Sequence, residues 1–435
     1  MFMREPKVSM RTENMTLEDE RETMQQPLQE TRQKERSGDV LYEYISRITA
    51  PDQTAMAQAK ERWNQVAKPL NSLGLLEDAV VKIAGITGDS HVNIEKKALI
   101  IMCADNGVVE EGVSQTGQEV TAVVTENFTK GDSCVCIMAK RAGVDVFPVD
   151  IGVAGNLEHC GEEYPLLKNK IMPGTKNFKR EPAMSRQEAT DAILTGIRLV
   201  EELKSKGYQL IATGEMGIGN TTTSSAVASI LTGFPVTSMT GKGAGLSDAG
   251  LELKIRVIEE AIRKYWPDGV YIDGACQDEA VQVGVCPDKA CQIGACPAED
   301  GQAGVCPAGA APDVLEVLSK VGGLDLAGLT GVFLGGAICH IPIVIDGFIS
   351  STAALAAARL CPAASGFMLA SHVSAEPAGG RILEQLQLSP MLTAHMCLGE
   401  GTGAIAVMPL LDMAADIYHK MSTFQEIQIE EYKPL

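Results

Sequence analysis

The stretch that decides the fold is "GYQLIATGEMGIGNTTTSSAVASILTGF", residues 207–234. Its first part, Gly207 to Thr213, is a short apolar run typical of a buried strand. Its last part, Ala226 to Phe234, predicts a helix that ends at Gly233. The glycines of the middle part, residues 214–225, therefore lie on a turn between a strand and a helix.

Such a turn has the features of a phosphate site. Free backbone N–H groups and the positive end of the helix dipole point out of it, and Gly217 and Gly219 let a ligand touch the backbone. Thr221 can cap the helix or bind the phosphate. The turn matches neither G-x-x-x-x-G-K-[ST] nor G-x-G-x-x-G, so a tight turn with a helix cap is an equally good interpretation of these residues alone. Glu215 would repel an anion and fits better beside a neutral or cationic part of a ligand.

Apolar strands alternate with helical segments on both sides of this stretch. The clearest helix covers residues 184–207, where Ser185 and Glu188 form a capping box. The alternation predicts an open, mostly parallel, Rossmann-like α/β sheet flanked by helices. The other expected strands are 97–107, 144–152, 331–340, 341–348 and 365–372.

Polar residues follow or end several of these strands. In parallel α/β sheets the ligand site lies at the carboxyl ends of the strands. We therefore expect these side chains to share one rim of the sheet: Asp105, Asn106, Asp150, Glu215, Asp346, Ser371 and His372.

Composition excludes several classes of partner. The net charge of −19 argues against nucleic acid and anionic membranes. No apolar run reaches the ~18 residues of a membrane span, and the N-terminal residues lack the apolar core of a signal peptide. We therefore expect a cytoplasmic protein whose 12 cysteines are free thiols.

Four regions are expected along the chain. Residues 1–38 are polar and charged and predict a disordered extension. Residues 80–380 predict a large α/β catalytic domain. The amphipathic helical segments 41–75 and 383–435 could not bury their apolar faces alone, so they are expected to form one smaller helical domain.

The fourth region, residues 274–313, is a tandem decapeptide. Glycine recurs at 274, 284, 294 and 304, and cysteine recurs at 276, 286, 296 and 306. Clustered thiols could form a metal site, but the spacings do not match paired C-x₂-C ligation. Proline and glycine with few large apolar residues favour a surface insertion instead.

A second glutamate, Glu400, stands between Gly399 and Gly401 and directly precedes an expected helix. It is either an acid that stabilises the helix N-terminus or a general base exposed by its small neighbours. No histidine has an H-x₃-H or H-E-x-x-H partner, and no G-x-S-x-G motif occurs. These absences argue against a zinc hydrolase and against a hydrolase with a nucleophile elbow.

Seven motifs occur in an order that resembles a known family. They are "ADNGVVEEGVS" (104–114), "QEVT" (118–121), "GEMGIGNTT" (214–222), "SKVGGLDLAGLTG" (319–331), "DGFISSTAALAA" (346–357), "SHVSAE" (371–376) and "LGEGTGA" (398–404). Over roughly residues 40–435 the chain resembles the nicotinate-nucleotide–dimethylbenzimidazole phosphoribosyltransferases of cobalamin nucleotide-loop assembly. The first 38 residues and the decapeptide depart from the family, and neither overlaps a motif.

The resemblance implies a reaction without cofactor or metal. Nicotinate mononucleotide gives its phosphoribosyl group to 5,6-dimethylbenzimidazole, and the products are α-ribazole 5′-phosphate and nicotinate. The cationic ring nitrogen of the donor becomes neutral as it leaves, so no metal is needed. The resemblance also implies a homodimer. Transfer to another base such as adenine, benzimidazole or a phenol is one alternative, and a non-catalytic nucleotide-binding or base-binding protein is another.

The resemblance implies roles for the matching residues. Glu400 falls on the base that deprotonates the acceptor. Gly217, Gly219, Asn220 and Thr221 fall on the phosphoribosyl-binding turn, and Glu215 falls near the ribose or the acceptor. The remaining matches are Lys254 and Ser374 for nucleotide binding, Ser114 and Gln118 for the acceptor pocket, and Asp346 for orienting groups near Glu400.

Overall fold

The computed structural model describes residues 37–267 and 312–432 of the chain. Its centre is a six-stranded parallel sheet in the order β3-β2-β1-β4-β5-β6. This is the strand order of the Rossmann sheet, in which the direction of winding reverses between β1 and β4. The predicted fold class is confirmed. The strands are β1 (Lys97–Ala104), β2 (Val144–Gly152), β3 (Leu167–Lys168), β4 (Leu210–Met216), β5 (Ile343–Ile345) and β6 (Met368–Ala370).

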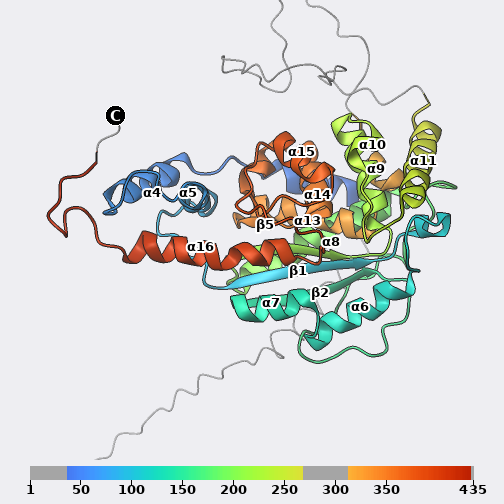
Figure 1. Ribbon diagram of the computed structural model, residues 1–435, viewed down its shortest axis with the longest axis horizontal. Helices are drawn as coiled ribbons and strands as arrows, with labels where there is room; N and C mark the ends of the chain where they lie inside the picture. The colour runs from blue at the N-terminus through green and yellow to red at the C-terminus, as the bar shows by residue number, and fades with distance from the viewer. Residues whose placement is uncertain (1–36, 268–311, 433–435) are drawn as a thin grey trace, which may run out of the picture.

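Helices cover both faces of the sheet, and successive side chains of β1 alternate between them. Ile100 and Met102 belong to the core shared with α8 (Arg186–Ser205), α9 (Asn220–Thr232), α13 (Leu324–Cys339) and α14 (Phe348–Leu360). Leu99 and Ile101 belong to the opposite core, which is shared with α5 (Leu75–Thr87), α7 (Cys134–Ala142) and α16 (Thr402–Lys420). Figure 1 shows α7 and α6 (Glu119–Lys130) on the side of β1 and β2 away from α9 and α14.

Further helices complete the fold around these layers. They are α3 (Ser37–Ser46), α4 (Gln53–Gln65), η2 (Gly107–Glu111), α10 (Val236–Met239), α11 (Asp248–Tyr265), α12 (Val314–Val321), η3 (Pro362–Phe367) and α15 (Ala378–Gln385). None of the helices in the two described parts of the chain has the length and apolar character needed to span a membrane.

The helix expected over residues 184–207 is confirmed as α8. The Ser185 hydroxyl accepts a hydrogen bond from the Glu188 N–H at 3.1 Å, and the Ser185 N–H donates to the Glu188 carboxylate at 2.7 Å. The strand expected from residue 207 begins three residues later and continues through Met216. Glu215 therefore belongs to β4 itself, and only Gly217 to Gly219 form the turn before α9.

The strand expected over residues 331–340 is wrong, because this segment is the second half of α13. A run of buried apolar residues has the same appearance in a buried helix and a buried strand. Glycines let α13 lie directly against α8: a Cβ on Gly331 would be 1.9 Å from the carbonyl oxygen of Ile193. The glycines that weaken the helical pattern are thus the residues that the helix packing requires.

The N-terminal and C-terminal segments meet on one side of the molecule, where α4 and α5 lie near α16 (Figure 1). Trp63 of α4 and Tyr418 of α16 form an edge contact with their ring centroids 5.1 Å apart. Val66 and Thr423 pair as an isolated antiparallel bridge. The α3 helix instead packs on α8. The division into a large and a small domain stays a prediction, as α16 also covers β4.

Two predictions fall largely outside the described residues. The extension at 1–38 has only its last two residues in α3, and the decapeptide region at 274–313 has only its last two residues before α12.

Candidate active site

The carboxyl edge of the sheet gathers the polar strand ends into one rim. The β1 residue Met102 is paired with Glu215 of β4, and the next β1 residue, Cys103, is paired with Asp150 of β2. Asp346 follows β5 directly. Because all strands are parallel, these ends share one edge of the sheet. The side chains are buried: Asp105, Asn106, Asp150, Glu215, Asp346, Ser371 and His372 are each at most 5 % exposed.

Glu400 occupies a strained turn at the start of α16. Three consecutive residues are left-handed, with φ values of 84° at Gly399, 63° at Glu400 and 98° at Gly401. A non-glycine residue rarely adopts this conformation, and such residues concentrate at functional sites. The turn lies against β4, since a Cβ on Gly214 would be 2.4 Å from the Glu400 carbonyl oxygen.

Asp346 holds this turn in place. Its carboxylate accepts hydrogen bonds from the backbone N–H groups of Gly401 at 3.2 Å, Gly403 at 2.7 Å and Ala404 at 3.0 Å. These N–H groups lie at the start of α16, where intrahelical partners are lacking. Asp346 therefore fixes the backbone beside Glu400 rather than facing an open site.

The two glutamates of the rim bind protons more tightly than ordinary carboxyls. Burial raises the pKa of Glu400, and the nearby Asp346 raises it further. Burial also raises the pKa of Glu215 well above its ordinary value, with added repulsion from Asp325 and Asp346. The Asn220 side chain donates a hydrogen bond to Glu215. A raised pKa brings a carboxylate closer to the operating pH and strengthens it as a proton acceptor.

The glycine turn after β4 presents the N-terminus of α9. Gly219 is left-handed with a φ of 92°, and a Cβ on Gly217 would be 2.2 Å from the carbonyl oxygen of Ala104. The hydroxyls of Thr222 and Ser224, in the first turns of α9, are buried and have no hydrogen-bond partner among the described residues. The turn thus combines a helix N-terminus with a backbone that only glycine allows.

Lys254 brings a buried cation to the start of α9. It is fully buried, and its ammonium donates to the Thr221 hydroxyl at 2.8 Å and to the Gly241 carbonyl at 3.1 Å. Burial lowers the pKa of Lys254 to about 8. A cation and a helix N-terminus at one place suit a phosphate group.

Three of the predicted residues have side chains that make only a local hydrogen bond or no helix cap. Ser374 is buried after β6, and its hydroxyl accepts a hydrogen bond from the Glu376 N–H at 3.3 Å. Ser114 is partly exposed and accepts from the Thr116 N–H at 3.3 Å. Gln118 precedes α6 and makes no side-chain cap. Among the hydrogen bonds of residues 37–267 and 312–432, none joins Ser114 or Gln118 to Glu400.

Comparisons with known proteins identify the family. A family model described as "Phosphoribosyltransferase" matches residues 48–281 and 301–429. The nicotinate-nucleotide–dimethylbenzimidazole phosphoribosyltransferase of Acetivibrio thermocellus is 43 % identical over 395 residues, which are 91 % of this chain and 99 % of that protein. The enzyme of the same name from Clostridium acetobutylicum is 43 % identical over 391 residues, or 90 % and 98 % of the two chains.

The chain belongs to the nicotinate-nucleotide–dimethylbenzimidazole phosphoribosyltransferase family.

A solved structure agrees with this assignment, and the resemblance noted from the sequence motifs is confirmed. The crystal structure of CobT from Thermus thermophilus superposes with a TM-score of 0.73 at 34 % identity, covering 87 % of this chain and all of that one. The match to the phosphoribosyltransferase model leaves out residues 282–300, which lie within the decapeptide region.

One buried acid of this family member was missed by the reasoning from sequence. Asp325 is fully buried at the start of α13, and burial raises its pKa to about 7. It lies within the motif "SKVGGLDLAGLTG", where the apolar helix pattern conceals it. The signal that could have revealed it is Gly322-Gly323 just before it, since Gly214 and Gly399 similarly precede the two glutamates of the rim.

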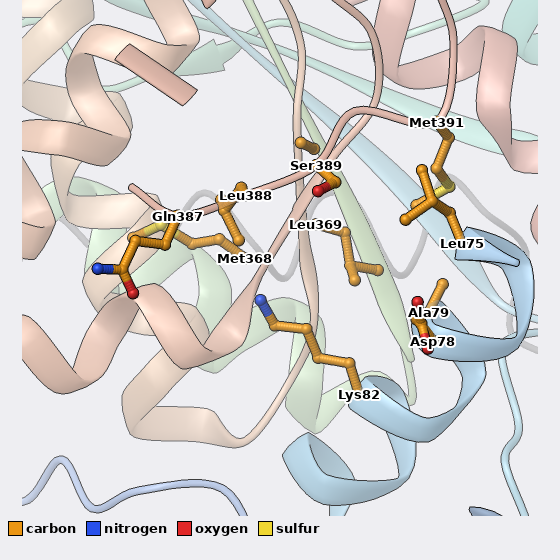
Figure 2. A pocket seen from close by; sticks show the side chains of 11 residues that line it. Leu75, Asp78, Ala79, Lys82, Met368, Leu369, Gln387, Leu388, Ser389 and Met391 are labelled. Atoms are coloured by element: carbon orange, nitrogen blue, oxygen red, sulfur yellow. The ribbon is translucent and has the colours of Figure 1, made fainter. Parts of the chain in front are cut away.

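A separate cavity of about 200 Å³ lies between α5, β6 and residues 387–391. Figure 2 shows the Lys82 side chain extending among its apolar lining residues, which include Met368, Leu369 and Leu388. Burial lowers the pKa of Lys82 to about 8, and its ammonium donates to the Ser365 carbonyl at 3.3 Å. None of the lining residues is one of the predicted site residues, so this cavity is distinct from the polar residues of the rim.

Proposed function

We propose that this chain transfers the phosphoribosyl group of nicotinate mononucleotide to 5,6-dimethylbenzimidazole, releasing α-ribazole 5′-phosphate and nicotinate. The observation that carries the proposal is Glu400, which is held in a left-handed turn by Asp346 and lies against Gly214 of β4. Family membership supplies the identity of the donor and the acceptor.

The donor phosphate binds at the N-terminus of α9. The helix follows Gly219 without a side-chain cap, so its positive end is available to the phosphate; Lys254 supplies the positive charge and Thr221 a hydroxyl. This arrangement holds C1′ of the ribose at the rim of the sheet. The nicotinate ring leaves with the electron pair of its bond to C1′, so its cationic ring nitrogen becomes neutral.

Glu400 acts on the acceptor. One imidazole nitrogen of dimethylbenzimidazole forms the new bond to C1′, and the other imidazole nitrogen loses its proton to the Glu400 carboxylate. Asp346 acts through the backbone by fixing the turn, and it is a positioning residue.

Glu215 is suited to the cationic part of the donor. It is buried in β4, and Asn220 holds its carboxyl group. A donor pyridinium placed beside it would be attracted to the ionised form and would lower its raised pKa. Ser374 completes nucleotide binding, while Ser114 and Gln118 line the acceptor pocket.

The test is incubation of the protein with nicotinate mononucleotide and dimethylbenzimidazole, followed by chromatography of both products. Release of nicotinate together with α-ribazole 5′-phosphate supports the proposal. A binding protein without turnover would release no nicotinate. A panel with adenine, benzimidazole and phenol as acceptors would show whether another base is preferred.

We also infer that the active form is a homodimer, as the family resemblance implies. Sedimentation velocity at micromolar protein tests this assembly. A single species with the mass of one chain would overturn it.

A further inference from the structure

Two buried acceptor atoms beside the phosphoribosyl turn have no donor. The Oδ2 atom of Asp325 and the Oδ1 atom of Asn106 have no hydrogen-bond partner of ordinary geometry within the described parts of the chain, although the Asn220 amide lies near enough to Asp325 to lower its pKa. Both residues are fully buried. The Asn106 amide is oriented by its Nδ2 atom, which donates to the Ile218 carbonyl at 3.5 Å. A buried acceptor without a donor destabilises the fold, so two adjacent ones call for an external donor.

Two glycines let the backbone lie directly against these two side chains. A Cβ on Gly217 would lie 2.9 Å from Asp325 Oδ2 and 3.1 Å from Asn106 Nδ2. A Cβ on Gly323 would lie 2.3 Å from Asp325 Oδ1 and 2.6 Å from Asn106 Oδ1. The two side chains therefore face the same two glycines, one of which belongs to the turn that binds the phosphoribosyl group in the proposed function.

We propose that Asp325 and Asn106 bind the ribose hydroxyls of the donor nucleotide, with the Asp325 carboxylate accepting from one hydroxyl and the Asn106 carbonyl from its neighbour. This inference rests on the proposed function for the identity of the donor. A ribose 2′,3′-diol offers two neighbouring O–H donors, which matches two neighbouring acceptors without donors. Hydroxyl donors also suit a place where further negative charge would be repelled by Glu215 and Asp325.

The electrostatics of Asp325 agree with a binding role. Its Oδ1 atom accepts the Leu326 N–H at 2.9 Å, and no lysine or arginine pairs with it among the described ion pairs. Burial raises the pKa of Asp325 to about 7. Buried acids with a strongly perturbed pKa cluster at functional sites.

The test is a double-mutant-type cycle, in which either the Asp325 carboxylate or one ribose hydroxyl of the donor is removed. Donor kcat/KM is measured for the unmodified chain and for Asp325→Asn, using nicotinate mononucleotide and its 2′-deoxy and 3′-deoxy analogues. Hydrogen bonds to a charged group contribute about 1.5–3 kcal/mol, so one deoxy analogue should lose roughly 10- to 150-fold with the unmodified chain. Asp325→Asn should lose a similar factor with the natural donor and little more with that analogue, because interacting groups are not additive.

A matched control is Glu77→Gln, which changes another buried acid, located in α5, that accepts a hydrogen bond from Lys68. It should discriminate against the deoxy analogues as strongly as the unmodified chain. A purely structural role for Asp325 would instead lower activity by the same factor with all three donors, and would overturn the inference.

Two further arms keep the inference testable. If Asp325→Asn does not fold, the unmodified chain decides, because equal kcat/KM values for all three donors would refute ribose recognition here. If the protein shows no turnover at all, the proposed function fails, and calorimetric binding of the same three nucleotides decides the inference separately. Equal affinities for the three would then refute it. Weaker binding of one deoxy form would support it if Asn106→Ala or Asp325→Asn abolishes this difference in affinity.

Discussion

Glu215 and Glu400 lie side by side, each packed against the glycine that precedes the other. A Cβ on Gly399 would be 2.5 Å from the Glu215 carboxylate, and a Cβ on Gly214 would be 2.4 Å from the Glu400 carbonyl oxygen. The two G-E pairs of the sequence thus form one reciprocal contact between β4 and the turn before α16. Any side chain at either glycine would force the two glutamates apart.

The first prediction is that Gly214→Ala removes most of the activity. The added methyl would collide with backbone of the Glu400 turn, which cannot move freely because Asp346 holds it by three N–H groups. Overpacking of this kind costs about 1–3 kcal/mol, so we expect a lower melting temperature and at least ~10-fold lower kcat. Calorimetry and steady-state kinetics measure both.

Gly380→Ala is the matched control. Gly380 lies within α15, and a Cβ on it would meet only Val373, at 4.0 Å. Alanine is favoured over glycine in a helix, so this variant should retain activity and stability. A Gly214→Ala protein as active as Gly380→Ala would show that the close contact between β4 and the Glu400 turn is not needed.

The second prediction concerns Glu400→Gln, which keeps the shape of the side chain and removes the base. Proton transfer to a positioned side chain contributes about 10²–10⁴ in rate, so kcat should fall by roughly that factor. Donor and acceptor contacts remain, and both KM values should change little. Initial rates of nicotinate release give these parameters.

The pH profile separates this role from a structural one. The carboxylate must be ionised to accept a proton, so kcat of the unmodified chain should fall as pH drops through the pKa of Glu400. Burial raises that pKa, so the fall should begin above the ordinary range of a glutamate. The residual activity of Glu400→Gln should lack this acid limb.

The third prediction is that Glu215→Gln raises the donor KM at least as much as it lowers kcat. The substitution removes the charge that a donor pyridinium would meet, while its amide oxygen can still accept from Asn220. Ground-state binding should therefore suffer first. If Glu400→Gln keeps most of its kcat while Glu215→Gln is nearly inactive, the base is Glu215.

The strands and helices around this rim could be predicted from the sequence because they have strong local signals. The bounds of β2 match the expected residues 144–152, and the capping box places the start of α8. Parallel order then brings Glu215 and Asp346 to one rim. The contact between Gly214 and Glu400 could not be predicted, since it joins segments far apart in the chain through tertiary packing.

The errors have a physical cause as well. The segment 331–340 is buried on nearly all sides, so neither the strand period nor the helix period is visible in its residues. Asp325 was overlooked for the same reason, because it is the one acid near the start of that apolar helix. Its importance depends on missing hydrogen-bond partners, and only three-dimensional geometry reveals those.

The fourth prediction is that deletion of residues 274–311 leaves kcat/KM within about twofold. The flanking helices have their own anchors: Tyr265 of α11 donates to the Phe178 carbonyl at 2.9 Å, and Asp313 before α12 pairs with Arg186. Loss of a tract with few core-forming residues should be tolerated. Kinetics and metal analysis check this, and one tightly bound zinc per full chain or a large loss of turnover would contradict the surface-insertion interpretation.

The last prediction is that Asp325→Asn stabilises the protein, and more so at pH 8 than at pH 5. Burial raises the pKa of Asp325 from 3.8 to about 7 in the folded chain. The unfolded chain therefore loses this proton first, and folding becomes less favourable as pH rises from 3.8 through about 7. Asparagine carries no charge, so the variant avoids this cost, as removal of a functional acid often does.

We expect the melting temperature of Asp325→Asn to exceed that of the unmodified chain by roughly 2–4 °C at pH 8, with a smaller difference at pH 5. Scanning calorimetry at the two pH values measures both differences. Glu77→Gln is the contrasting control, because Glu77 accepts from Lys68 at 2.6 Å and from the Leu73 N–H at 2.8 Å and should lose stability when changed. An Asp325→Asn protein that melts lower than the unmodified chain at pH 8 would show that the carboxylate stabilises the fold, which contradicts its assignment to the ribose.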